Sequence, residues 1–152
     1  MRHNTNVLYR GALSALVASA LASGCSLQTM AVNAVMPTIA NPEVYLSEED
    51  PELIRNALPF LLKTIESVLE TEPSRRDALL FANNGFLLYA NAFLQHDAAL
   101  AEWTDYERAA ELNERARRMY LRARDYGLRL VEIEHPGITD RLFEDPAAAG
   151  MV

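Results

Sequence analysis

Few side chains in the sequence are of a type and spacing that could perform covalent or metal chemistry. His96 and His135 lie far apart along the chain, and neither has a second ligand at the spacing of a metal site. No segment matches the nucleophile motif G-x-S-x-G or a glycine-rich phosphate loop. Carboxylate pairs such as Glu132 and Glu134 are expected to be solvated on helix surfaces. We therefore predict that the protein is not an enzyme and holds no metal or cofactor.

One side chain has a specific predicted chemistry, and it is the only cysteine, Cys25. It follows a basic start and an uncharged apolar stretch, residues 11–22, an arrangement typical of a secretory signal. That stretch is shorter than the roughly 20 residues that a membrane-spanning helix needs. With the small residues A-S-G directly before the cysteine, the site resembles a bacterial lipobox, which implies cleavage after residue 24 and lipidation of Cys25. The alternative is an ordinary signal peptide followed by a buried thiol. Ser26 after the cysteine implies sorting to the outer membrane.

The balance of charge restricts the class of partner. Lys and Arg number 14 and Asp and Glu number 21, which gives a net charge of −7, and every acidic residue lies after residue 24. An acidic surface repels nucleic acid phosphates and anionic lipid headgroups. We therefore expect no nucleic acid partner, and we expect attachment to a membrane to depend on the lipid at Cys25.

Apolar residues at three- and four-residue steps predict an all-α fold. A short helix over residues 26–36 is expected to end at Pro37, with an irregular connection from there to residue 49. Asp50 and Pro51 are an N-cap and a first-turn proline, and the helix that they open is predicted to extend to about residue 71. Pro59 lies inside this helix and is expected to kink it, unless the helix proper begins there.

Two further long helices and the start of a fourth are predicted. A capping box at Ser74 opens the second, which extends to about residue 99, and a capping box at Thr104 opens the third, which extends to Glu134. The sequence His-Pro-Gly at 135–137 ends the third helix, and a fourth begins near Thr139. No segment has the alternation of a strand with hairpin signals.

The second helix is predicted to be buried between two neighbours because it is apolar on two sides. One face consists of Leu79, Ala82, Phe86, Tyr89 and Phe93, and the other of Leu80, Leu87, Leu94 and Ala98. Small residues are expected to allow close approach of another helix, namely Ala82, Gly85 and Ala92. The third helix is predicted to turn inward a stripe of Tyr106, Ala109, Ala116, Tyr120, Ala123, Gly127 and Leu130.

Long helices joined by short turns predict stacked antiparallel hairpins. Leu61, Ile65, Val68 and Pro73 have the spacing of the second helix of a tetratricopeptide repeat, and part of this pattern recurs from Ala116. We predict a truncated solenoid of cryptic tetratricopeptide-like repeats at 51–152, preceded by an anchor-proximal helix and linker at 25–50 and a lipoprotein signal peptide at 1–24. Fewer than two repeats are complete, so we expect the front part of a longer protein, with an apolar patch exposed around Leu142 and Phe143.

Four runs of sequence carry a resemblance to a known family. They are CSLQTMAVNAV, DPELIRNALPFLLKTIESVLETEPS, GFLLYANAFLQ and RARRMYLRARDYGLRLVE with the following IEHPG. In this order they resemble the T components of TRAP transporters, the TatT family, of which this chain corresponds to the N-terminal half. The resemblance implies a non-catalytic periplasmic lipoprotein that binds the solute-binding P component, assembles as a homotrimer and provides a path for a small hydrophobic ligand.

The candidate contacts with a ligand or partner are Tyr89, Phe93, Tyr126 and Arg124. The alternative for the aromatic residues is a place in the core, where a buried tyrosine needs a partner for its hydroxyl group. For Arg124, within RARDYGLR, a structural role between hairpins is the first expectation. A second hypothesis for the whole protein is an outer-membrane lipoprotein with tetratricopeptide repeats that serves as a scaffold in envelope assembly.

Overall fold

The computed structural model describes residues 30–39 and 41–144, and the chain divides into two compact units with the boundary after Ile39. The all-α prediction is confirmed: the described residues form helices joined by short turns, and none of them lies in a strand. In the first unit, residues 30–39 are helical, so the prediction that Pro37 ends this helix is wrong. Proline removes one helical hydrogen bond, and here the helix continues for two residues beyond it.

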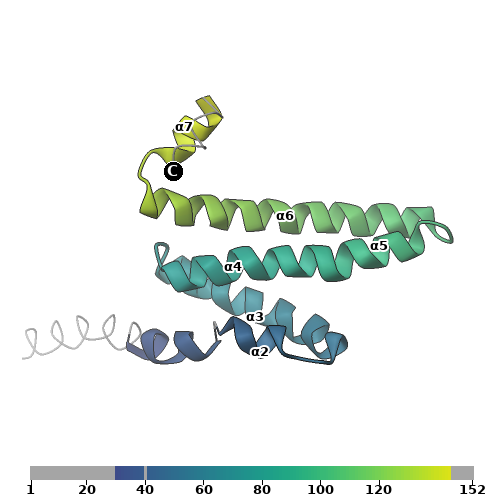
Figure 1. Ribbon diagram of the computed structural model, residues 1–152, viewed down its shortest axis with the longest axis horizontal. Coiled ribbons are helices and arrows are strands. Elements are labelled where there is room, and N and C mark those ends of the chain that lie inside the picture. The colour runs from purple at the N-terminus through teal and green to yellow at the C-terminus, as the bar shows by residue number, and fades with distance from the viewer. Residues whose placement is uncertain (1–29, 40, 145–152) are drawn as a thin grey trace, which may run out of the picture. The chain divides into compact units, whose positions relative to one another are not determined.

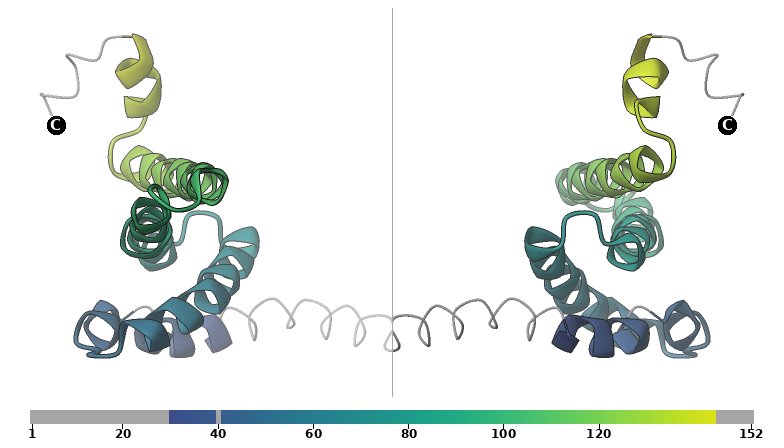
Figure 2. Two further views of the ribbon diagram at one scale, coloured as in Figure 1. Left: turned by 90° about the vertical axis from the view of Figure 1, so that its right-hand side faces the viewer. Right: turned by 90° about the vertical axis from the view of Figure 1, so that its left-hand side faces the viewer.

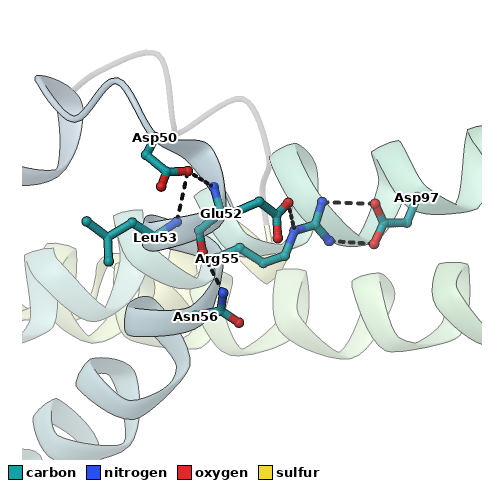
Figure 3. A network of polar contacts seen from close by, with 6 residues as sticks. All are labelled: Asp50, Glu52, Leu53, Arg55, Asn56 and Asp97. Carbon is teal, nitrogen blue, oxygen red and sulfur yellow. Dashed lines mark hydrogen bonds and ion pairs between the residues drawn. The ribbon is translucent and has the colours of Figure 1, made fainter.

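The second unit opens with two helices, α2 (Pro42–Leu46) and α3 (Pro51–Thr71). The irregular connection expected before residue 49 is therefore partly helical. Asn41 accepts a hydrogen bond from the backbone N–H of Glu43 at 3.1 Å, and Pro42 follows it at the first helical position, which together are a helix-start signal. The start of α3 is confirmed. Asp50 accepts from the N–H groups of Glu52 at 2.9 Å and Leu53 at 3.3 Å (Figure 3).

The predicted second helix is a continuous rod of three parts: α4 (Arg76–Leu88), the π-helix η1 (Tyr89–Gln95) and α5 (His96–Ala101). The capping box at Ser74 is wrong, because the N-cap is Arg75 and its side chain makes no capping bond. The guanidinium of Arg75 instead donates to Glu72 at 2.9 Å and to Asp77 at 2.8 Å, and these ion pairs stabilise the α3–α4 turn.

The π-helical segment has a physical cause in the spacing of the core residues. Buried residues recur at every fourth position of the rod, at Ala78, Ala82, Phe86, Ala90, Leu94 and Ala98. In an α-helix of 3.6 residues per turn, each four-residue step advances about 40° beyond a full turn, so six such positions would leave the buried face. The wider i→i+5 turns of η1 compensate for this advance and keep the residues on the side that faces the core.

The third long helix, α6 (Tyr106–Glu134), lies antiparallel to this rod, and α7 (Ile138–Glu144) follows it (Figure 1). The N-cap of α6 is Asp105, which accepts from the N–H of Arg108 at 2.9 Å, and not Thr104 as predicted. The predicted break at 135–137 is confirmed. Gly137 adopts a positive φ of 80°, which favours glycine because it has no Cβ.

The α4–α5 rod lies between α3 and α6, and both of them pack against it, as predicted for a helix buried between two neighbours (Figures 1 and 2). Gly85 faces α3, and a Cβ there would lie 2.7 Å from Cδ2 of Leu62, so the predicted close approach at Gly85 is confirmed. Phe86 faces α6, where its ring stacks on Tyr126. Leu80 and Leu87 lie on the part of the rod's surface that neither α3 nor α6 covers, and they are exposed. The prediction of burial for these two leucines is wrong.

Other expected core positions also lie at the surface. Ala92 and Tyr106 are exposed, whereas Ala109, Ala116 and Ala123 of the predicted inward stripe are buried. Leu112, which the stripe omitted, is buried as well. Phe143 is exposed as expected. In the part of the chain that the structure describes, no helix combines the length and apolarity needed to cross a bilayer.

Candidate functional site

An open cleft of about 400 Å³ lies between α3 and the C-terminal half of α6. Its walls carry acidic and basic side chains from both helices: Lys63, Glu66, Ser67 and Glu70 from α3, and Arg122, Asp125, Tyr126 and Arg129 from α6. Of the residues that the sequence singled out as candidate contacts, Tyr126 is the one that lines this cleft.

Glu66 is the centre of the polar contacts in the cleft. Its carboxylate accepts hydrogen bonds from Nζ of Lys63 at 2.5 Å and from the hydroxyl of Tyr126 at 2.9 Å, and Arg122 lies at 3.4 Å. Burial raises the pKa of Glu66, but the hydrogen bonds from Lys63 and Tyr126 and the charge of Arg122 outweigh it and hold this pKa below its ordinary value. The carboxylate is therefore ionised and paired at neutral pH.

Tyr126 is held by contacts at its ring and at its hydroxyl group. The ring stacks on Phe86 with a centroid distance of 5.8 Å and an angle of 14°, and the guanidinium of Arg129 lies 5.4 Å from the ring centroid. Burial, together with the hydrogen bond to Glu66, raises the pKa of Tyr126 to about 12. A neutral phenol beside a paired carboxylate cannot exchange a proton readily near pH 7, which does not fit general acid–base catalysis.

The run RARDYGLR, residues 122–129, makes further contacts that join α6 to the α3–α4 hairpin. Nδ2 of Asn83 donates to the carbonyl of Ala123 at 2.8 Å, and a Cβ at Gly127 would lie 2.8 Å from the same nitrogen. Arg129 donates to the carbonyl of Pro73 at 2.6 Å, at the α3–α4 turn. This part of α6 therefore fixes the position of the helix through hydrogen bonds, and Gly127 provides the space for one of them.

Beyond this run, Glu132 connects α6 to α7. Its carboxylate accepts from the backbone N–H groups of Gly137 at 2.5 Å and Thr139 at 3.0 Å. These bonds hold the pKa of Glu132 below its ordinary value. Glu134 forms an ion pair with Arg76 at the start of α4. The expectation that both carboxylates are merely solvated is wrong. The turn at 135–137 brings backbone N–H donors to Glu132, and the packing of α6 against α4 brings Arg76 to Glu134.

Tyr89 and Phe93 lie together in η1, on a different part of the molecule. Their ring centroids are 5.7 Å apart, and the guanidinium of Arg55 from α3 lies 4.8 Å from the Phe93 centroid. The same guanidinium donates to both carboxylate oxygens of Asp97 at 2.6 and 3.1 Å (Figure 3). The hydrogen bond from Arg55 lowers the pKa of Asp97. Phe93 is only 6% exposed, so it belongs to the core beneath this ion pair.

The four candidate contacts are therefore not gathered in one site. Arg124 is exposed, and its guanidinium pairs with its neighbour Asp125 at 2.6 Å. Cys25 lies outside the described residues.

The Arg55–Asp97 and Glu66–Tyr126 contacts were not predicted, since their partners are about 40 and 60 residues apart in sequence and no local pattern relates them. Among the described residues, no cluster of three or more His, Cys, Asp or Glu side chains could hold a metal ion.

Comparison with known proteins identifies the family. The family model described as TRAP transporter T-component matches residues 47–150, which include the residues of the α3–α6 cleft and the Arg55–Asp97 ion pair. The chain belongs to the TRAP transporter T-component family. The resemblance to T components of TRAP transporters that the sequence predicted is therefore confirmed.

A curated protein is also similar to this T-component chain. The chain is 32% identical over 138 residues to an uncharacterized protein of Treponema pallidum (strain Nichols). The match covers 81% of this chain and 43% of that relative, so the chain spans less than half of the relative's length. No solved structure is significantly similar to this T-component chain.

Proposed function

We propose that this chain is a non-catalytic accessory of a TRAP-type transport system, which binds the solute-binding P component in the periplasm. The observation that carries the proposal is the family match over residues 47–150. The contacts at the centre of the α3–α6 cleft agree with it, because Glu66 is paired with Lys63, Tyr126 and Arg122. The family match also favours this role over a scaffold in envelope assembly.

Binding of the P component can be tested with purified proteins. Residues 26–152 are mixed with the solute-binding protein encoded in the same TRAP system, and the heat of association is measured by calorimetry. We expect saturable binding, with no binding to a solute-binding protein from an unrelated transport system. Sedimentation of the same sample tests the proposed trimer. Absence of binding to the cognate protein would refute the accessory role.

The proposal includes a lipid anchor at Cys25. A lipid on this residue would keep the protein at the periplasmic face of the outer membrane, where the T component could meet a diffusing solute-binding protein. The Cys25→Ala variant should accumulate as an uncleaved precursor and lose palmitate labelling, whereas Ser26→Ala should be processed normally. Labelling that persists in Cys25→Ala would show that the lipid is attached to another residue.

A small hydrophobic ligand is the last part of the proposal. A second open cleft of about 410 Å³ lies between the α3–α4 turn, α6 and the start of α7, and its apolar side chains are Pro73, Leu128 and Ile133. Its size is within the usual range of about 300–1,000 Å³ for small-molecule sites. Binding of the apolar probe 1-anilinonaphthalene-8-sulfonate should weaken in Ile133→Arg and not in the control Leu80→Arg. Equal binding by the two variants would exclude this cleft.

A further inference from the structure

The turn between α5 and α6 exposes three large apolar or aromatic side chains within seven residues. Leu100 is 67% exposed, Trp103 is 90% exposed and Tyr106 is 76% exposed. Trp103 is the only tryptophan of the chain. Figure 1 shows this turn at the end of the α5–α6 pair, beyond the end of α3. We call Leu100, Trp103 and Tyr106 the tip residues.

Hydrogen bonds hold the backbone beneath the tip residues. The N–H groups of Thr104 and Asp105 both donate to the carbonyl of Ala101, at 3.0 and 2.7 Å. The side chain of Asp105 caps α6 through the N–H of Arg108 at 2.9 Å. The tip therefore presents its side chains from an ordered turn, so a partner that binds them would meet a small entropic cost for ordering the backbone.

The surroundings of the tip are acidic. Residues 97–107 contain four carboxylates, at Asp97, Glu102, Asp105 and Glu107, and no Lys or Arg. Asp97 is paired with Arg55, which leaves three carboxylates close in sequence to Trp103. The next basic residue along the chain, Arg108, pairs with Glu111 at 3.2 Å. The tip is thus an apolar centre with a negative rim.

The negative charge of this rim favours some binding partners of the tip over others. Two copies of the tip in contact would bring carboxylates against carboxylates, and an anionic bilayer would repel them as well. A protein surface with an apolar pocket surrounded by Lys and Arg complements both the centre and the rim. Tryptophan and tyrosine at the centre of a patch are also the residues that most often dominate the energy of protein–protein binding.

We propose that the tip residues insert into an apolar pocket, rimmed by basic side chains, on a partner protein. This inference rests on the proposed function, because it takes the solute-binding component as that partner. The exposed tryptophan provides a direct observable. Its fluorescence emission shifts to shorter wavelength when the indole ring leaves water, and no other tryptophan of this chain contributes to the signal.

The experiment titrates residues 26–152 with the purified solute-binding component of the same system. We expect a blue shift of Trp103 emission on binding, recorded with a tryptophan-free or 5-fluorotryptophan-labelled partner. By calorimetry, Trp103→Ala should weaken binding by at least about thirty-fold, since truncation of a central aromatic residue removes a hot spot. The matched control is Phe143→Ala, which removes an aromatic side chain of similar exposure, 73%, from α7 and should change affinity less than about two-fold.

A second variant tests the rim. Glu102→Gln combined with Glu107→Gln keeps the shape of the tip and the cap at Asp105, so it should reduce affinity and also make binding less sensitive to salt. Equal salt dependence in this variant and in the unaltered chain would overturn the basic-rimmed partner surface.

The remaining outcomes separate this inference from the proposed function. If the unaltered chain binds the component and Trp103→Ala binds equally well, the tip is not the docking site and the proposed function stands. If the unaltered chain does not bind it, both are refuted. Binding to phosphatidylcholine–phosphatidylglycerol vesicles, or self-association, that is lost in Trp103→Ala would assign the tip to a membrane or to a second copy and overturn the inference.

Discussion

The two halves of α6 pack against the α4–α5 rod in different ways. In the N-terminal half, Leu112 and Ala116 are buried against Ala90, Leu94 and Ala98, and the contact is mainly apolar, with one hydrogen bond from the Tyr120 hydroxyl to Gln95 at 2.5 Å. In the C-terminal half, residues 122–129 make directional contacts with α3, with α4 and with the turn between them. Apolar packing stabilises the contact between α6 and the rod. The hydrogen bonds and the stacking of Phe86 on Tyr126 determine the register of α6 along the rod.

The directional half contains RARDYGLR, which is part of one of the four runs that carry the family resemblance. Several positions of this run make specific contacts with other helices. Ala123 accepts a hydrogen bond from Asn83, Tyr126 binds Glu66, and Gly127 leaves room for Asn83. A small apolar residue can be exchanged for another of similar volume, but these contacts depend on particular atoms. A motif of high specificity is therefore expected in this half.

The largest effect is expected from the apolar half. Leu112→Ala should lower the free energy of unfolding by about 2–5 kcal/mol, because it leaves a cavity beside Ala90 and Leu94. Leu87→Ala removes the same side chain from an exposed position of α4 and should cost no more than about 0.5 kcal/mol. Chemical denaturation monitored by circular dichroism measures both. Equal losses would mean that Leu112 is not in a close-packed core.

The contact between α3 and α4 can be tested by changing only the size of one side chain. Gly85→Leu should cost about 1–3 kcal/mol, because even a Cβ at this position would lie 2.7 Å from Leu62. The control Asn84→Leu places the same side chain at the next, exposed position. Thermal unfolding should show a lower midpoint for the first variant only. If Gly85→Leu is as stable as the control, α3 does not approach α4 at this point.

A smaller effect is expected from the hydrogen bond to Ala123. Asn83→Ala removes the donor and should cost about 0.5–1.5 kcal/mol relative to Asn84→Ala. The neighbouring asparagine is an appropriate control because it is exposed and because both changes bring the same gain in helix propensity. Urea denaturation of the two variants gives the difference directly. Equal stability of the two variants would show that the register of α6 against α4 does not depend on this hydrogen bond.

The smallest effect is a pH dependence from Tyr126. Its pKa is about 12 in the folded protein against an ordinary value of 10.0, so loss of the proton favours the unfolded chain. The contribution of Tyr126 to stability is complete below pH 10 and is lost as the pH rises from 10 to about 12. The Tyr126→Phe variant, which has no phenol proton, should lose less stability than the unaltered protein over this range. Parallel curves would contradict the raised pKa.

The helices themselves could be predicted closely from the sequence. The Asp50–Pro51 start, the end of the third helix at Glu134 and the break before Ile138 all depend on caps and breakers that lie within a few residues of the boundary. Asn41–Pro42 has the same type of signal and could have been used to predict α2. The π-helix was also detectable, because buried small and large residues at every fourth position do not fit 3.6 residues per turn.

Other features depended on the tertiary structure. The periodicity of α4 is compatible with burial of Leu80 and Leu87, and they are exposed because neither α3 nor α6 covers this part of the helix surface. The contacts at Glu66, Asp97 and Glu132 were not predicted, since a carboxylate on a helix gives no indication of which donor will reach it.

Local sequence thus determined where the helices begin and end, because capping, proline geometry and helical period act over three to seven residues. The cleft of Tyr126 and the ion pair over Phe93 were decided only when helices distant in sequence came together. Their energies arise from pairs of groups about 40 to 60 residues apart, and the distance between such groups depends on how the helices pack.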